Sequence, residues 1–314
     1  MTVLMAGCGD LGTEAALRFA AAGHRVVGWR RSPEKLPAAI EGATADLTSG
    51  ELPPIPADTT AVVVAIAADS PTEGAYRAAY VDGLSNVLDA VAGSGAPVRR
   101  VLFVSSTAVY GEAAGDWIDE ATTPEPGGFS GRIIREAEEL LFSRLDGSGI
   151  TPVVLRLGGI YGPGRTRLID QVRGGSAVIS AAPRFTNRIH RDDAAAAIVH
   201  LGTRAPDPAP VYLGVDNEPA EMGEVLRFLA AELGLPLPPP DTAEGDEHNS
   251  TTAQAGGLKA GRTPAGGKQS GEPSRGGNKR CSNALLRSTG FEFIYPTFRE
   301  GYRAILTGVG VRYP

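Results

Sequence analysis

The chain contains 314 residues, of which 42% are hydrophobic and 21% charged, so it can bury the core of one large α/β domain or of a main domain with a smaller partner. Its formal net charge of -6 gives no general reason to expect nucleic acid as a partner. Cys8 and Cys281 are far apart, which provides neither metal-ligand spacing nor a disulfide framework and suits a reducing cytoplasm. We expect a cytoplasmic protein, because no signal-peptide pattern or apolar run of about 18 residues is present.

The first half of the chain alternates short apolar runs with segments of helical periodicity. Strands are predicted over residues 3–6, 25–29, 60–66, 100–104 and 152–157, and helices over 14–22, 76–91 and 132–145. Strands that alternate with helices of about ten or more residues form right-handed βαβ units. The pattern therefore predicts a parallel sheet covered by helices.

The second half is less regular. Helices are predicted over 192–201 and 219–233, with a short strand at 211–213. Residues 241–278 lack hydrophobic periodicity, so we expect a disordered loop there, because it cannot bury enough apolar surface to offset the cost of ordering. Its basic residues have no aromatic neighbours for base stacking, which favours a solvated loop over a nucleic-acid site. We expect a nucleotide-binding domain over 1–160, to which 188–204 returns, and a smaller substrate-side region over 161–314.

A glycine-rich turn follows the first strand directly. Gly7 permits a tight turn, Gly9 lets the backbone approach a pyrophosphate, and Gly12 lets the helix pack against the strand. The N-terminus of the helix would face the negative phosphates. The cofactor contacts predicted in this turn are Gly7, Cys8, Gly9, Asp10, Leu11 and Gly12. The alternative is an ordinary tight turn, with Cys8 as a small filler.

The end of the second strand indicates which nicotinamide dinucleotide is bound. An acidic residue there would hydrogen-bond the ribose 2′-hydroxyl of NAD. This chain instead has Arg30, Arg31 and Ser32, whose guanidinium and hydroxyl groups suit a 2′-phosphate. We therefore expect NADP(H) in preference to NAD(H), with two solvated surface arginines as the alternative. Asp46 and Leu47 are expected near the adenine or, alternatively, in a surface turn.

Four further segments resemble the extended short-chain dehydrogenase/reductase family, which includes NAD-dependent nucleotide-sugar epimerases and dehydratases. They are SSTAVYG at 105–111, RLGGIYGPGR at 156–165, RIHRDDA at 188–194, and GF with YPTFREG at 290–301. The resemblance covers nearly all of the chain outside 241–278. It implies a Rossmann-type doubly wound parallel sheet with a smaller C-terminal substrate-side domain, and a homodimer formed through helices 76–91 and 132–145.

The chain departs from the family at the catalytic pair. Members usually carry YxxxK, in which the tyrosine exchanges a proton and the lysine lowers its pKa. Aligned on the acidic pair at 138–139, the tyrosine place falls on Ser130 and the lysine place on Ile134. No tyrosine lies between Gly111 and Ile160. The first glycine of the family's phosphate loop also falls on Ala6, and the chain looks like an atypical member.

Five residues are the candidates for contacts with substrate. Ser106 matches the family's catalytic Ser/Thr, with capping of the strand-end loop as the alternative role. Tyr110 and Tyr161 are candidate proton donors, although tyrosines in these family motifs usually have structural or lining roles. Arg165 is expected to grip an anionic substrate, and His190 to line the pocket or to serve as a structural histidine.

Two functions remain open on the sequence. The first is an NADP(H)-dependent oxidoreductase or epimerase that acts on a small polar, sugar-like substrate, and it is favoured by the intact motif around Ser106 and the substrate loop 161–165. The second is a non-catalytic NADP(H)-binding redox sensor or interaction module, favoured by the missing YxxxK pair. Turnover of NADPH with carbonyl or sugar-nucleotide substrates would distinguish them.

Overall fold

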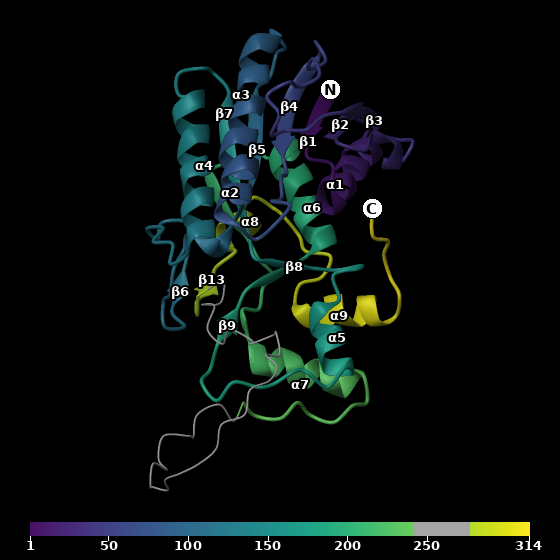
Figure 1. Ribbon diagram of the computed structural model, residues 1–314, viewed down its shortest axis with the longest axis vertical. Helices are drawn as coiled ribbons and strands as arrows, with labels where there is room; N and C mark the ends of the chain where they lie inside the picture. The colour runs from purple at the N-terminus through teal and green to yellow at the C-terminus, as the bar shows by residue number, and fades with distance from the viewer. Residues whose placement is uncertain (242–276) are drawn as a thin grey trace, which may run out of the picture.

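A seven-stranded parallel sheet forms the centre of the molecule in the computed structural model, which describes residues 1–241 and 277–314 (Figure 1). Its strands are β1 (Thr2–Ala6), β2 (Arg25–Arg30), β3 (Glu41–Thr44), β4 (Thr59–Val64), β5 (Arg100–Ser106), β7 (Thr151–Leu157) and β11 (Val211–Gly214). They lie in the order β11-β7-β5-β4-β1-β2-β3, and all neighbours are parallel. The order reverses between β1 and β4, which confirms the predicted Rossmann-type doubly wound sheet.

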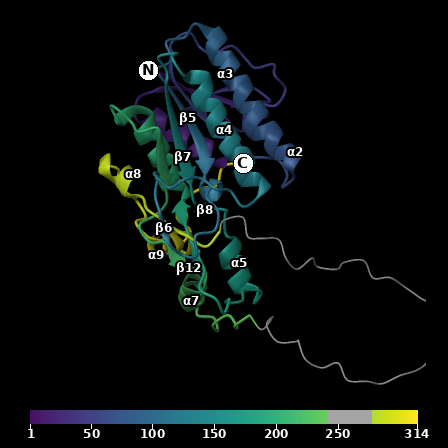
Figure 2. The ribbon, with the colours of Figure 1, turned by 90° about the vertical axis from the view of Figure 1, so that its left-hand side faces the viewer.

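Helices cover both faces of this sheet (Figures 1 and 2). They are α1 (Asp10–Ala21) and α6 (Arg191–Val199) on one face, and α3 (Gly83–Ser94) and α4 (Phe129–Leu145) on the other. Alternate strand residues point to opposite faces. Val3 and Met5 accordingly pack in the core beneath α1 and α6, whereas Leu4 and Ala6 pack beneath α3 and α4. The near-continuous apolar strands therefore supply two cores at once.

The helix predicted over 76–91 is built from three consecutive parts. They are α2 (Glu73–Tyr76), a π-helical segment (Arg77–Asp82) and α3. π-Helical turns are rare and occur frequently at functional sites. This segment follows β4 in the chain. In doubly wound folds, ligands bind at the carboxyl ends of the strands.

A smaller region lies beyond the carboxyl ends of the strands (Figure 1). Its helices are α5 (Arg167–Arg173), α7 (Met222–Glu232) and α9 (Phe298–Leu306), which share a core around Ile169, Leu229 and Phe298. Short strand pairs connect it to the sheet. They are β8 (Gly159–Tyr161) with β10 (Arg188–His190), β9 (Phe185–Thr186) with β12 (Ala220–Glu221), and β6 (Trp117–Ile118) with β13 (Arg280–Cys281), the last followed by α8 (Ala284–Ser288).

The chain crosses more than once between the sheet and the smaller region. Helix α6 packs on one face of the sheet, and strand β11 lies in the sheet itself, at its edge beside β7. Apart from residues 241, 277 and 278, the loop expected over 241–278 lies outside the described residues. Within the described ranges, no helix has the length and apolar content to cross a membrane.

Candidate cofactor and substrate site

The glycine-rich turn between β1 and α1 has no room for side chains at two positions. A Cβ on Gly7, whose φ is +97°, would lie 2.3 Å from the carbonyl oxygen of Ala65. A Cβ on Gly12 would lie 2.3 Å from the carbonyl oxygen of Gly7. Gly9 has open space on its Cβ side, with no atom within 4 Å. The turn thus fits tightly to the sheet and leaves its backbone accessible at Gly9, as a pyrophosphate site requires.

A cavity of about 510 Å³ lies over this turn, within the usual range for ligand pockets. The predicted cofactor residues that line it are Gly7, Cys8, Gly9, Arg30, Arg31, Ser32, Asp46 and Leu47. Lys35 also lines it, from a 3₁₀ turn (Pro33–Lys35) after β2 that the sequence interpretation did not single out. Burial raises the pKa of the Cys8 thiol to about 12, so Cys8 stays protonated and acts as a small filler.

The two arginines after β2 differ in their partners. Arg31 is exposed and binds both carboxylate oxygens of Asp69, at 2.6 and 2.8 Å. Arg30 donates from Nη2 to the carbonyl oxygen of Pro314 at 2.9 Å. Its Nη1 is buried and has no hydrogen-bond partner among the described residues. Arg30 therefore has a donor to spare beside the cavity, whereas Arg31 has a competing carboxylate.

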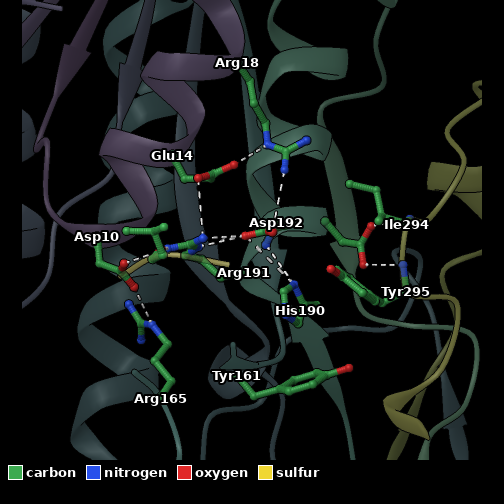
Figure 3. A network of polar contacts seen from close by, with 12 residues as sticks. Asp10, Glu14, Arg18, Tyr161, Arg165, His190, Arg191, Asp192, Ile294 and Tyr295 are labelled. Carbon is green, nitrogen blue, oxygen red and sulfur yellow. Dashed lines mark hydrogen bonds and ion pairs between the residues drawn. The ribbon is translucent and has the colours of Figure 1, made fainter. Parts of the chain in front are cut away.

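The remaining residues of the turn lie outside the cavity lining. Leu11 and Gly12 pack inside the fold. Asp10 accepts hydrogen bonds from Arg165 Nε at 2.9 Å and from the buried Arg191 Nη1 at 3.1 Å, as Figure 3 shows. The backbone N–H of Tyr313 also donates to Asp10, at 3.2 Å. Asp10 thus connects the cofactor turn to the substrate loop and to the C-terminal segment.

A second cavity, of about 880 Å³, lies between the sheet and the smaller region. Ser106, Tyr161 and Arg165 line it, together with Ser130 and Ile134, the two positions predicted for the family's catalytic pair. Ser106 Oγ also accepts a hydrogen bond from the backbone N–H of Ala108 at 3.2 Å. Ser106 therefore caps the turn after β5 and faces the cavity.

Tyr110 and Tyr161 both use their hydroxyl groups in the fold. Tyr110 is buried outside the cavity lining, and its hydroxyl donates to the carbonyl of Asp119 at 3.0 Å and accepts from Arg156 Nη1 at 2.5 Å. The Tyr161 ring borders the cavity, but its hydroxyl donates to the carbonyl of Thr297 at 3.5 Å. Burial raises the pKa of Tyr161. A proton-donor role for either tyrosine would require these contacts to break.

His190 lies behind the cavity and outside its lining. It is 1% exposed, and its Nδ1 accepts a hydrogen bond from the backbone N–H of Asp192 at 3.2 Å, which caps α6 (Figure 3). Burial lowers its pKa to about 4, so the ring is neutral at neutral pH. Arg191, next in the chain, binds Asp192 Oδ1 at 2.6 Å within α6. It also contacts Asp10 at 3.1 Å and Glu14 at 3.4 Å, and these two ion pairs hold α6 against α1.

Comparison with known proteins gives a consistent assignment. Residues 3–207 match the sequence profile of the NAD dependent epimerase/dehydratase family. The chain belongs to this family. Protein YeeZ of Escherichia coli K12 is 32% identical over 171 residues, a match that covers 52% of this chain and 60% of YeeZ.

Two solved structures extend this comparison over nearly the whole chain. A candidate NAD-dependent epimerase/dehydratase from Methylobacillus flagellatus is 34% identical, with a TM-score of 0.70 and coverage of 98% of this chain and 97% of the other. Human epimerase family protein SDR39U1, solved with NADPH, matches with a TM-score of 0.73 over 98% of this chain and 100% of the human chain. The two sequences are only 19% identical, so this match supports the fold alone.

The sequence analysis did not single out two tyrosines that line the second cavity. Tyr76 and Tyr80 line the second cavity, and their ring centroids are 5.4 Å apart. Tyr76 also packs edge-on against Phe129, 5.5 Å away and next to Ser130. Ala75, Ala78 and Ala79 line the cofactor cavity, so this segment separates the two cavities. Its signal in the sequence is a pair of tyrosines four residues apart on a helix that follows β4.

Proposed function

We propose that the protein is an NADP(H)-dependent oxidoreductase or epimerase that acts on a small polar, sugar-like substrate. The observation that carries the proposal is the pair of adjoining cavities, one over the glycine turn and one beside Ser106. The first has the size and the exposed backbone that a dinucleotide needs. The second brings a substrate next to the cofactor and to the hydroxyl of Ser106.

The preference for NADP(H) is supported by charge at the end of β2. Arg30, Arg31 and Lys35 all line the cofactor cavity there. Asp46 and Asp69 line it too, but Asp69 is paired with Arg31, and Asp46 accepts the N–H and hydroxyl of Thr48. The buried, unpartnered Nη1 of Arg30 is a donor that a 2′-phosphate would satisfy.

The second cavity can supply a proton without the family's tyrosine. Ser106 would orient a substrate carbonyl or hydroxyl, and Tyr76 and Tyr80 supply phenols to the lining of the same cavity. Burial raises the pKa of Tyr80 to about 12, so its phenol is protonated at neutral pH. A neutral phenol can donate a proton to the oxygen of a carbonyl that is being reduced. This favours reduction by NADPH as the direction of the reaction.

Calorimetric titration with NADPH and NADH tests the cofactor assignment directly. Hydrogen bonds to charged groups contribute about 1.5–3 kcal/mol each. The loss of one such bond weakens binding roughly 10-fold to 100-fold, so the variant Arg30→Ala/Arg31→Ala should bind NADPH at least about 10-fold more weakly, while its affinity for NADH changes little. Arg25→Ala is the matched control, because Arg25 lies at the other end of β2 and pairs with Glu41 and Asp58. Equal wild-type affinities for the two nucleotides, or an unchanged affinity for NADPH in the double variant, would contradict the assignment.

A non-catalytic NADP(H)-binding sensor is the second candidate. The observation that favours it is that Ser130 and Ile134 line the cavity where the catalytic pair would stand. Ile134 cannot supply the positive charge that the family's lysine provides. Oxidation of NADPH with a panel of carbonyl compounds separates the candidates, since binding without turnover across the panel supports the sensor.

A further inference from the structure

Residues 309–314, here called the C-terminal segment, follow α9 and end beside α1 (Figure 1). The segment is irregular in structure and mostly exposed. Val309 and Val311 are 50% and 64% exposed, so burial of apolar surface contributes little to its position. Polar and ring contacts therefore hold the segment where it lies.

These contacts join the C-terminal segment to both cavities' borders. Arg312 Nη1 donates to the carbonyl oxygen of Gly164 at 3.2 Å, which ties the segment to the substrate loop. The backbone N–H of Tyr313 donates to Asp10 in the cofactor turn at 3.2 Å. The guanidinium of Arg191 lies over the Tyr313 ring, 5.2 Å from its centroid. Together these contacts bring the next residue, Pro314, to the end of β2.

Pro314 contacts the arginine that supports the cofactor assignment. Its carbonyl oxygen accepts a hydrogen bond from Arg30 Nη2 at 2.9 Å, in an exposed position. A phosphate binds a guanidinium most strongly through two parallel N–H bonds. The carbonyl oxygen of Pro314 carries a partial negative charge beside the same guanidinium, so it competes for the donors of Arg30 and repels a phosphate there.

We propose that the C-terminal segment is an internal competitor of the 2′-phosphate of the cofactor. In the free protein the segment holds Arg30, and it leaves Arg30 when the phosphate binds. A site that is partly occupied by its own chain binds its ligand with an apparent affinity lowered by the occupied fraction. Because the competition acts at Arg30, it lowers the affinity for the phosphorylated dinucleotide and leaves the affinity for NADH unchanged. This inference rests on the place given to Arg30 in the proposed function.

The test compares two nucleotides that differ only in the 2′-phosphate. Adenosine 2′,5′-bisphosphate and adenosine 5′-monophosphate are titrated calorimetrically into the wild type and the variant Arg312→Gly/Tyr313→Ser/Pro314→Gly. The variant removes the contacts of Arg312 and Tyr313 and adds backbone freedom, so its segment should leave Arg30. We expect the bisphosphate to bind the variant about 3-fold to 10-fold more tightly, which is the net contribution of one hydrogen bond. The affinity for the monophosphate should not change.

A second background identifies Arg30 as the contested residue. In Arg30→Ala protein, the same triple substitution should leave the affinity for the bisphosphate unchanged, because the donor is absent. Val309→Ser is the matched control, because Val309 is an exposed residue of the same segment, and it should bind both nucleotides as the wild type does. Unchanged affinity for the bisphosphate in the triple variant would overturn the proposal. Equal tightening of both nucleotides, or equal tightening with and without Arg30, would overturn it too.

The same titrations separate this proposal from the cofactor assignment. If the wild type prefers the bisphosphate and the triple substitution changes nothing, the assignment stands and the competition falls. If only the triple variant prefers the bisphosphate, the segment masks the 2′-phosphate site in the wild type, as proposed. If neither protein binds the bisphosphate, both the assignment and the competition fall.

Discussion

Replacing Glu138 by alanine should destabilise the fold far more than a typical substitution. Glu138 is fully buried in α4 and accepts hydrogen bonds from Arg156 at 2.9 and 2.6 Å. Ser105 Oγ donates to it at 2.6 Å, so the carboxylate joins α4 to the ends of β5 and β7 beside Ser106. Without it, the guanidinium of Arg156, which is 2% exposed, would keep only the Tyr110 hydroxyl as a hydrogen-bond partner among the described residues. Removing one member of a buried ion pair costs about 3–5 kcal/mol.

Urea unfolding followed by circular dichroism measures this effect. Glu139→Ala is the matched control, because Glu139 is the next residue on the helix, its side chain is 62% exposed, and it forms an exposed ion pair with Arg135 at 3.0 Å. An exposed pair of that kind contributes about 0.2–1 kcal/mol. The double variant Glu138→Leu/Arg156→Leu should recover much of the stability, because a well-packed apolar pair removes both buried charges. Equal losses for Glu138→Ala and Glu139→Ala would refute the reasoning.

Two further predictions concern single carboxyl groups. Asp69→Asn should release Arg31 from its exposed ion pair and tighten binding of NADPH up to about 5-fold, since such pairs contribute at most about 1 kcal/mol; an unchanged affinity in a calorimetric titration would exclude Arg31 from the 2′-phosphate site. Asp216→Asn should flatten the dependence of thermal stability on pH. Burial raises the pKa of Asp216 from 3.8 to about 7, so its stabilising contribution is full below its unfolded-state pKa and is lost as the pH rises through 7. The unfolding midpoint should therefore fall less in the variant than in the wild type between about pH 5 and pH 8, with a residual dependence from Asp193, whose pKa is also raised to about 7.

The buried strands were predictable because their signal is local. An apolar run such as 60–66 can bury all of its side chains only as a strand in a sheet that is covered on both faces. The edge strand β3 (Glu41–Thr44) was missed, because its residues are mostly exposed and its strand character comes from pairing with β2. Helix α9 (Phe298–Leu306) was not predicted as a helix, because the sequence analysis used this segment only for its resemblance to the family; in the structure Phe298 packs against α7.

The same distinction applies to the site. Gly7 and Gly12 are needed because backbone atoms lie too close for a side chain, and the spacing of glycines in the turn motif predicts this close approach. The pairing of Arg165 with Asp10 joins residues 155 positions apart, which no local pattern encodes. Arg165 lines the cavity, but its charge is already balanced, so its role in gripping an anionic substrate stays a prediction. Arg167, Arg184 and Arg188 also line the second cavity and were not singled out, because nothing in the sequence places these three positions together.

The residues at the two positions predicted for the catalytic pair bear on which reaction the cavity can support. An epimerase of this family type must first remove a proton from a hydroxyl group, which needs a phenolate or another base. With isoleucine at position 134, the site lacks the lysine that would lower the pKa of a nearby phenol. Burial raises the pKa of Tyr80 to about 12, so its phenol stays protonated at neutral pH and is not available as a base, although the raised pKa also makes it a weaker proton donor. We infer that a reductase fits this cavity better than an epimerase, because reduction of a carbonyl by bound NADPH would need a protonated donor and no base.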